Sequence, residues 1–189
     1  MANKRMALKL IFNLLGSCLI SMAVAGASTT IDKRAILNAE YLIATLDGVE
    51  RIRFQNGEYQ RGSSVFQEGF LVAKLQDLKF SDLNNDGFQD VVAIAASNTG
   101  GSASWISLSG LLGGQKLVPL EPVFLGDRVV VSNILIEKGS NISIEKGSRG
   151  SAQVCLDMLV HGPNDGMCCP TKKERRCFVL SERRWIPRK

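Results

Sequence analysis

The sequence contains little of the side-chain chemistry on which most enzymes depend. Its 189 residues include a single histidine, His161, and five cysteines. There is no G-x-S-x-G nucleophile motif, no H-E-x-x-H zinc motif and no phosphate-binding loop. The cysteines also lack the paired Cys-x-x-Cys spacing that is usual in zinc sites. These absences count against the commonest hydrolase, zinc and nucleotide-binding classes.

Proline is scarce too, and the chain has no obvious linker. Only five prolines are present, and no proline-rich, serine-rich or acidic segment separates two parts of the sequence. About 160 residues remain once an N-terminal leader is set aside, a length that suits one domain with a sizeable core. We therefore expect a single domain over residues 28–189.

The first 27 residues have the pattern of a secretory signal peptide. Three basic residues precede an apolar run over residues 10–25, and small residues at positions 25–27 fit a cleavage site. We expect residues 1–27 to be removed, and the mature protein to be periplasmic or secreted from a bacterial cell without a transmembrane segment. Two alternatives stay open, an uncleaved membrane anchor and a lipoprotein that is anchored through Cys18.

Net charge is unevenly distributed along the mature chain. Twenty basic and eighteen acidic residues leave a net charge of +2, yet residues 171–189 alone carry +6. Such a segment can attract phosphate, lipid or an acidic glycan. It can also be a solvated strand face, because the apolar residues 177–180 interrupt its charges. We do not expect nucleic acid as a partner of an exported protein with one short basic segment; an envelope protein or a glycan is the better candidate.

Four cysteines remain after the leader. An even number in an exported chain favours disulfides, here within a C-terminal part over residues 155–177. Adjacent cysteines rarely bond each other, because a vicinal disulfide departs from ordinary disulfide spacing. We therefore expect one of the neighbours Cys168 and Cys169 to join Cys155 and the other to join Cys177.

His161 lies near these cysteines, in the segment HGPNDGMCCP. A metal site, or a thiol nucleophile in which His161 activates Cys168, is the chemical alternative to disulfides. Export into an oxidising compartment argues against free thiols. We expect His161 to cap the turn that Gly162-Pro163 opens.

The mature chain has the pattern of a mainly β, antiparallel domain, either a sandwich or an open barrel. Residues 49–54 alternate between apolar and polar side chains, as in a half-buried strand. Asp47-Gly48 and Asn56-Gly57 predict the tight turns of a meander, because these residues tolerate positive φ. The continuous apolar run over residues 91–96 predicts a central strand that is covered on both faces.

One short N-terminal helix is expected over residues 32–39, with Asp32 as its N-cap. In the segment over residues 153–160, alternation predicts a core face of Val154, Leu156, Met158 and Val160. The expected strands cover residues 41–46, 49–54, 58–59, 70–80, 91–96, 105–111, 128–136, 153–160 and 176–180.

Residues 133–148 contain a near-copy of eight residues, NILIEKGS followed directly by NISIEKGS. Two copies of so short a period do not make a solenoid. We expect a hairpin arm that lengthens two strands. The alternative is an exposed binding hairpin, which would suit an inhibitor or another partner-binding protein.

The strongest candidate site is the loop SDLNNDGFQDVV, residues 81–92. Its D-x-N-x-D-G-x-x-D pattern places oxygen-bearing side chains at alternate positions: Asp82, Asn84, Asp86 and Asp90. Calcium prefers six to eight oxygen ligands, and the backbone carbonyl of Phe88 would add one. Three carboxylates so close in sequence repel one another, which a divalent cation would relieve. The pattern therefore predicts a calcium site.

Two features limit this interpretation. Position 12 of the loop is Ala93, where an EF-hand has a bidentate glutamate, and the flanking segments are expected strands, so the loop is not an EF-hand. The alternative without an ion is an Asx-type turn, in which Asp82 and Asn84 bond backbone amides.

Residues 81–110 resemble an FG-GAP or VCBS-type unit, in which such a loop joins two antiparallel strands. The resemblance implies calcium binding at the acidic positions named above. FG-GAP units usually recur to build a propeller, and this chain has a single one. Most of the mature chain also resembles small exported bacterial proteins of uncharacterised function, in which the segments NAEY, the acidic loop, LGDRV and HGPNDGMCCP occur in this order. This resemblance implies export and no particular activity.

The sequence thus favours an exported, non-catalytic β-domain that calcium and disulfides stabilise, with a binding or structural role in the envelope. A secreted hydrolase that uses the acidic loop, or a Cys/His thiol enzyme, is one alternative. An inhibitor or partner-binding protein is the other.

Overall fold

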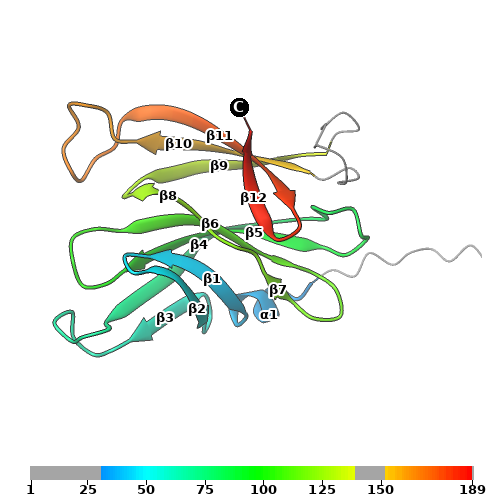
Figure 1. Cartoon of the computed structure of the whole chain (residues 1–189), viewed down its shortest axis with the longest axis horizontal. Coiled ribbons are helices and arrows are strands. Elements are labelled where there is room, and N and C mark those ends of the chain that lie inside the picture. The colour runs from blue at the N-terminus through cyan, green and yellow to red at the C-terminus, as the bar shows by residue number, and fades with distance from the viewer. Residues whose placement is uncertain (1–30, 139–151, 189) are drawn as a thin grey trace, which may run out of the picture.

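The computed structural model describes residues 31–138 and 152–188, and it shows a mainly β protein built in three layers (Figure 1). The expected leader with Cys18, and the second copy of the eight-residue repeat, lie outside the described residues. The elements are α1 (Lys33–Leu37), β1 (Glu40–Thr45), β2 (Gly48–Arg53), β3 (Glu58–Arg61), β4 (Leu71–Ser81), β5 (Asp90–Asn98), β6 (Trp105–Leu112), β7 (Val118–Pro119), β8 (Val123–Asp127), β9 (Val130–Glu137), β10 (Gln153–Val160), β11 (Lys172–Ser181) and β12 (Arg184–Arg188).

Antiparallel strands form three sheets. The central sheet has the order β3-β4-β5-β6-β7, with β8 also paired to β6. A four-stranded sheet of order β12-β11-β10-β9 covers one of its faces, and the β1–β2 hairpin with α1 covers the other (Figure 1). The expected antiparallel, mainly β sandwich with one short N-terminal helix is confirmed.

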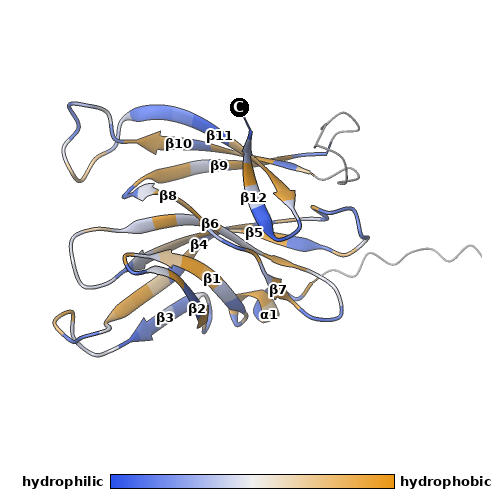
Figure 2. Cartoon of the chain, in the orientation of Figure 1, coloured by the Kyte–Doolittle hydropathy of each residue, from blue (hydrophilic) through white to orange (hydrophobic). Residues whose placement is uncertain are grey.

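Strand β5 is the strand that both outer layers share. Val92 and Ile94 belong to the core beneath the four-stranded sheet, while Val91, Ala93 and Ala95 belong to the core beneath the β1–β2 hairpin. All five side chains are buried, which accounts for the unbroken apolar run (Figure 2). The expectation of a central strand covered on both faces is confirmed.

The four-stranded sheet contributes one face of each strand to its core. In β10 the buried face consists of Val154, Leu156, Met158 and Val160, as the alternation predicts. In β11, Phe178 and Leu180 occupy the same core. At about 25 cal/mol per Å² of apolar surface removed from water, side chains of this size each stabilise the fold by about 1.5–3 kcal/mol.

Serine hydroxyls attach the β1–β2 hairpin to the central sheet. The edge of β1 that faces β5 and β6 has no strand partner among the described residues, so its carbonyl groups need other donors. Ser97 Oγ donates to the carbonyl of Ala44 and Ser109 Oγ to that of Leu42, both at 2.7 Å. The hydroxyl groups of these two buried serines, which lie in otherwise apolar strands, therefore find their hydrogen-bond acceptors in the β1–β2 hairpin.

Most expected elements are present, with shifted limits. Asp32 caps α1, because its Oδ1 accepts the amide of Arg34 at 2.9 Å. The first turn is wrong by one residue, since Thr45 pairs with Gly48 and the turn is Leu46-Asp47 rather than Asp47-Gly48.

The expected meander does not continue as one sheet beyond the second turn. Asn56 and Gly57 do have positive φ, of 53° and 83°, as the turn prediction requires. However, β2 pairs with β1, whereas β3 pairs with β4, so this turn passes the chain from one layer to the next. Three short strands, β7, β8 and β12, were not expected from the sequence.

Gly110 marks the closest approach of β6 to its neighbours. A Cβ at this position would collide with the carbonyl oxygen of Val91 and lie 3.0 Å from the Leu120 side chain. Gly110→Ala should lower the free energy of unfolding by about 1–3 kcal/mol in urea titrations, because overpacked cores shift their backbone. Gly101→Ala is the control, since its Cβ would have no heavy atom closer than 4.0 Å. Equal stability of the two variants would contradict this account of the packing.

Candidate functional site

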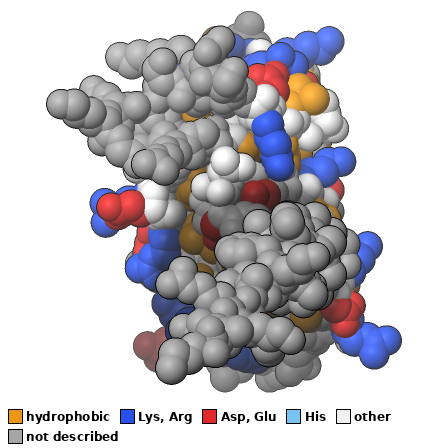
Figure 3. All heavy atoms as spheres, turned by 90° about the vertical axis from the view of Figure 1, so that its right-hand side faces the viewer, with side chains coloured by type: hydrophobic (Ala, Val, Ile, Leu, Met, Phe, Trp, Pro, Cys, Tyr) orange, Lys and Arg blue, Asp and Glu red, His pale blue; other side chains and the backbone are white. Residues whose placement is uncertain are grey.

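The acidic loop connects β4 to β5, two neighbouring strands of the central sheet. The pair Ser81 and Asp90 closes its base. The loop lies at the end of the molecule that Figure 3 faces, where charged side chains lie around the rim. The first residue after the gap in the described chain is attached here too, because the amide of Ala152 donates to the Leu83 carbonyl at 2.9 Å.

Side-chain oxygens hold the loop through its own backbone. The Asp82 carboxylate accepts the amides of Asp86 and Gly87 at 3.1 and 3.0 Å. Asn84 Oδ1 also accepts the Asp86 amide, and its Nδ2 donates to Asp86 Oδ2 at 2.8 Å. Asp86 Oδ1 in turn accepts the amide of Phe88 at 2.9 Å, and the Phe88 side chain is exposed. These are the hydrogen bonds of the Asx-type turn that the sequence offers as an alternative.

Asp90 has a different role from the other three. It is fully buried, and its two oxygens accept the amides of Leu83 and Gly113, each at 2.8 Å. Burial raises the pKa of Asp90, and the negative charges of Asp86 and Asp82 raise it further, while the two amides oppose the rise. Asp90 therefore ties the acidic loop to the connection that follows β6, a role that the sequence did not indicate.

The donor set fits calcium by its chemistry, since the four side chains offer only oxygen to a cation. None of the three carboxylates makes a salt bridge with a lysine or arginine among the described residues. Within residues 31–138 and 152–188, however, no three acidic, cysteine or histidine side chains converge closely enough to form a metal centre. The loop thus holds three carboxylates that no lysine or arginine among the described residues neutralises. Hydrogen bonds within the loop fix the positions of Asp82 and Asp86.

The disulfide pairing expected from the sequence is wrong. Cys155 bonds Cys177, and Cys168 bonds its neighbour Cys169. Cys155 and Cys177 are directly opposite in the β10–β11 ladder, with Cα atoms 4.0 Å apart. The ladder continues for five more pairs before the loop that holds the other two cysteines. At about 3.4 Å per residue, this separates the two pairs by roughly 17 Å, too far for the expected bridges.

Asp165, rather than His161, closes the turn after β10. Its carboxylate accepts the amides of Gly162 and Thr171 at 2.7 and 2.8 Å, and the Thr171 hydroxyl at 2.7 Å. These hydrogen bonds lower the pKa of Asp165. The expectation that His161 caps this turn is therefore wrong, and Cys168 is not free to act as the thiol partner of His161 because it is bonded to Cys169.

The basic C-terminal segment forms β11 and β12, as expected for a strand with a solvated face. Arg175 makes a two-point ion pair with Asp157 across the ladder, at 2.6 and 3.0 Å. Arg176 pairs with Glu174 at 2.6 Å and donates to the Leu125 carbonyl at 2.8 Å. Asp157 lies outside the segment and offsets one of its six net positive charges, whereas Glu174 is already counted in the +6.

An open groove of about 660 Å³, lined by both polar and apolar side chains, lies over β3, β4 and β5. Arg53, Gln60, Lys74 and Asn98 are among its lining residues, and Lys74 pairs with Glu58 at 2.8 Å. No sequence signal could have found it, because its lining comes from segments that lie far apart in the chain.

Comparison with models of known protein families, with curated proteins and with solved structures finds no match for this chain. The described residues contain no helix that is both long and apolar enough to cross a membrane. The disulfides are compatible with an extracellular or periplasmic protein.

The two disulfides should differ sharply in their effect on stability. Cys155 and Cys177 are 22 residues apart in sequence, so their bridge restricts the unfolded chain by about 3 kcal/mol, whereas a bridge between neighbours closes almost no loop. In guanidinium titrations, the free energy of unfolding should therefore fall strongly in C155S/C177S and change little in the matched variant C168S/C169S. Similar losses of stability in both variants would contradict the disulfide pairing. Peptide mapping without reduction tests the same pairing independently.

The Asp165 turn predicts a pH-dependent contribution to stability. Because the folded pKa lies below the ordinary value of about 3.9, the carboxylate stabilises the fold above that value and loses this effect as the pH falls through the folded pKa. Asp165→Asn should therefore have a lower free energy of unfolding than the wild type at neutral pH. The difference between the two should become smaller in acid. The exposed Asp47→Asn serves as control. A difference in stability that does not change with pH would contradict the proposed contribution of the Asp165 carboxylate.

Proposed function

We propose that this protein is an exported, non-catalytic β-domain that binds calcium through its acidic loop and has a binding or structural role in a bacterial envelope. The observation that carries the proposal is the concentration of three carboxylates in one loop without a lysine or arginine salt bridge among the described residues. The ligands would be Asp82, Asn84, Asp86, Asp90 and the carbonyl of Phe88.

Electrostatics support a cation at this loop. Asp82 and Asp86 lie near enough to Asp90 to raise its pKa, so the three negative charges repel one another when all are ionised. A divalent cation offsets this repulsion. Since Asp90 also accepts the amide of Gly113, an ion at the loop would stiffen the connection between β6 and β7 as well.

The enzyme alternatives have less support. The oxygens of Asp82 and Asp86 accept amides of their own loop, and both carboxylates belong to one tight turn instead of flanking a groove. In the thiol alternative, the sulfur of Cys168 is already bonded to Cys169. Disulfide bonding also agrees with the expected export to an oxidising compartment.

Calcium should raise the melting temperature of the protein. With a dissociation constant of about 0.1 mM, in the range of extracellular modules, about 1 mM calcium would stabilise the fold by about 1.4 kcal/mol. In a domain of this size that corresponds to a rise of about 3–6 °C, measured by scanning calorimetry in calcium and in EGTA.

Two variants separate the loop from other effects of calcium. Asp86→Ala should abolish the rise, whereas Asp47→Ala, an exposed carboxylate in the β1–β2 turn, should retain it. An identical melting curve in calcium and in EGTA for the wild type would rule out the proposed site. A rise that persists in Asp86→Ala would place the ion elsewhere.

A further inference from the structure

Of the two disulfides among the described residues, one is buried in a sheet and the other is exposed in a loop. Cys155 is 2% exposed and Cys177 is half-buried, and the two are joined across the β10–β11 ladder. Cys168 and Cys169 are both exposed, in the connection between β10 and β11. A thiolate must reach a sulfur atom to open a disulfide, so the second bridge is far more accessible to a reductant from outside.

A glycine leaves one side of the exposed bridge uncovered. A Cβ at Gly166 would lie 3.8 Å from Cys168 Sγ, and no other heavy atom beyond its chain neighbours would come within 4 Å. A larger side chain would therefore cover this sulfur in part. The neighbouring Met167 does not cover it in the manner of a core residue, because 69% of its own surface is exposed.

The ends of the loop are held without the help of the bridge. The Asp165 carboxylate accepts the amides of Gly162 and Thr171 and the hydroxyl of Thr171. These two partners lie on either side of both cysteines in the chain, and Pro170, directly before Thr171, is buried. Opening the bridge should therefore leave β10 and β11 in place and alter only residues within the loop.

Thermodynamic linkage makes the exposed bridge the easier one to reduce. The free energy by which a disulfide stabilises the fold is also the free energy by which folding favours that disulfide over its two thiols. Cys155 and Cys177 are 22 residues apart, so folding protects their bridge strongly. A bridge between neighbours closes almost no loop, so folding gives Cys168–Cys169 almost no such protection.

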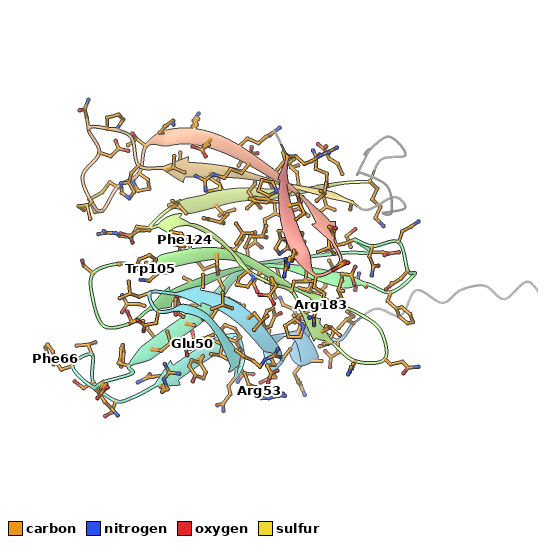
Figure 4. The ribbon with its side chains drawn as sticks, in the orientation of Figure 1. Glu50, Arg53, Phe66, Trp105, Phe124 and Arg183 are labelled. Carbon is orange, nitrogen blue, oxygen red and sulfur yellow. A yellow bond between two sulfur atoms is a disulfide. The ribbon has the colours of Figure 1, made fainter. Side chains whose placement is uncertain are left out.

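The loop over residues 161–171 lies at the opposite end of the molecule from the acidic loop. Strand β10 begins beside the acidic loop, where the amide of Ala152 bonds the Leu83 carbonyl, and it leads into residues 161–171 at its other end. Figure 1 shows this arrangement, and Trp105 and Phe124, labelled in Figure 4, lie at the same end as the loop. The inference about the bridge is therefore independent of calcium binding.

We propose that Cys168–Cys169 is a reversible redox site, which a dithiol reductant opens while Cys155–Cys177 and the fold stay intact. A thiolate of the reductant attacks one of the two sulfurs and forms a mixed disulfide, and the other cysteine leaves as a thiolate that takes up a proton. The second thiol of the reductant then attacks its own partner sulfur and releases the remaining cysteine. The products are two protein thiols and the disulfide of the reductant.

The donor would be a protein that presents an accessible dithiol, the chemical class that carries out thiol–disulfide exchange outside the cytosol. Reduction opens the small ring that joins the two cysteines, so the peptide between them gains conformations that the ring forbids. The amide of Cys169 donates to the Gly166 carbonyl at 3.0 Å, and this hydrogen bond lies within the segment that changes. The loop thus presents a different surface around Met167 in each redox state, on one unchanged fold.

Timed reduction of the folded protein, in the form that cells export, tests the proposal with dithiothreitol as the dithiol. Samples are alkylated with iodoacetamide and mapped by mass spectrometry without further reduction. Cys168 and Cys169 should be alkylated at least about tenfold faster than Cys155 and Cys177, because burial and folding protect only the second pair. In C168S/C169S the fast phase should disappear, and the slow reduction of Cys155–Cys177 should remain.

An equilibrium measurement and spectra of the reduced form give independent readouts. In a dithiothreitol redox buffer, Cys168–Cys169 should be half-reduced at a lower ratio of reduced to oxidised reagent than Cys155–Cys177. Amide shifts in NMR spectra should change only within residues 161–171 on selective reduction. They should return to their first positions when oxidised glutathione closes the bridge again.

Four results would overturn the proposal. The first is equal rates of reduction at the two bridges, and the second is reduction of Cys168–Cys169 that keeps pace with the loss of near-ultraviolet circular dichroism, which would mean that the protein must unfold first. The third is a set of amide shifts that extends through β10 and β11. The fourth is alkylation of Cys168 and Cys169 in protein that has never met a reductant.

Discussion

The burial of β5 on both faces is the constraint on which the rest of this structure depends. A strand that is covered on one face can leave polar side chains in solvent, but β5 buries Val91 and Ala93 against one layer and Val92 and Ile94 against another. Both outer layers therefore depend on the same strand for their cores. A displacement of β5 by one residue would exchange the two sets of side chains between the layers.

The candidate site follows from this arrangement. The acidic loop leads directly into β5, and Asp90, the first residue of the strand, holds the loop to Leu83 and Gly113. At the other end of β5, the chain turns through residues 99–104 into β6.

The sequence was most informative where local chemistry decides the structure. The apolar run 91–96, the alternation in β10 and the Asp32 cap each depend on neighbours in the chain, and each prediction is confirmed. The disulfide pairing failed because it depends on the β10–β11 register, which places Cys155 opposite Cys177 and which no local pattern reveals. The hydrogen bonds from serines to the carbonyl groups of β1 likewise depend on the assembled layers.

In the acidic loop, too, the sequence predicted some side-chain contacts and missed others. Its spacing predicted that Asp82, Asn84 and Asp86 turn toward one another, and their shared hydrogen bonds agree with that. The spacing could not distinguish Asp90, whose carboxylate is buried and bonded to two amides from different parts of the chain. Calcium binding remains a proposal that rests on the unpaired charge of these groups.

Amide hydrogen exchange, measured residue by residue in calcium and in EGTA, tests the central claim most directly. The account predicts that β5 amides exchange only through global unfolding in both conditions, and that calcium slows exchange at Leu83, Gly87 and Gly113, whose amides bond the loop carboxylates. Exchange at these three amides that does not respond to calcium, together with β5 amides that open before the rest of the fold, would contradict it.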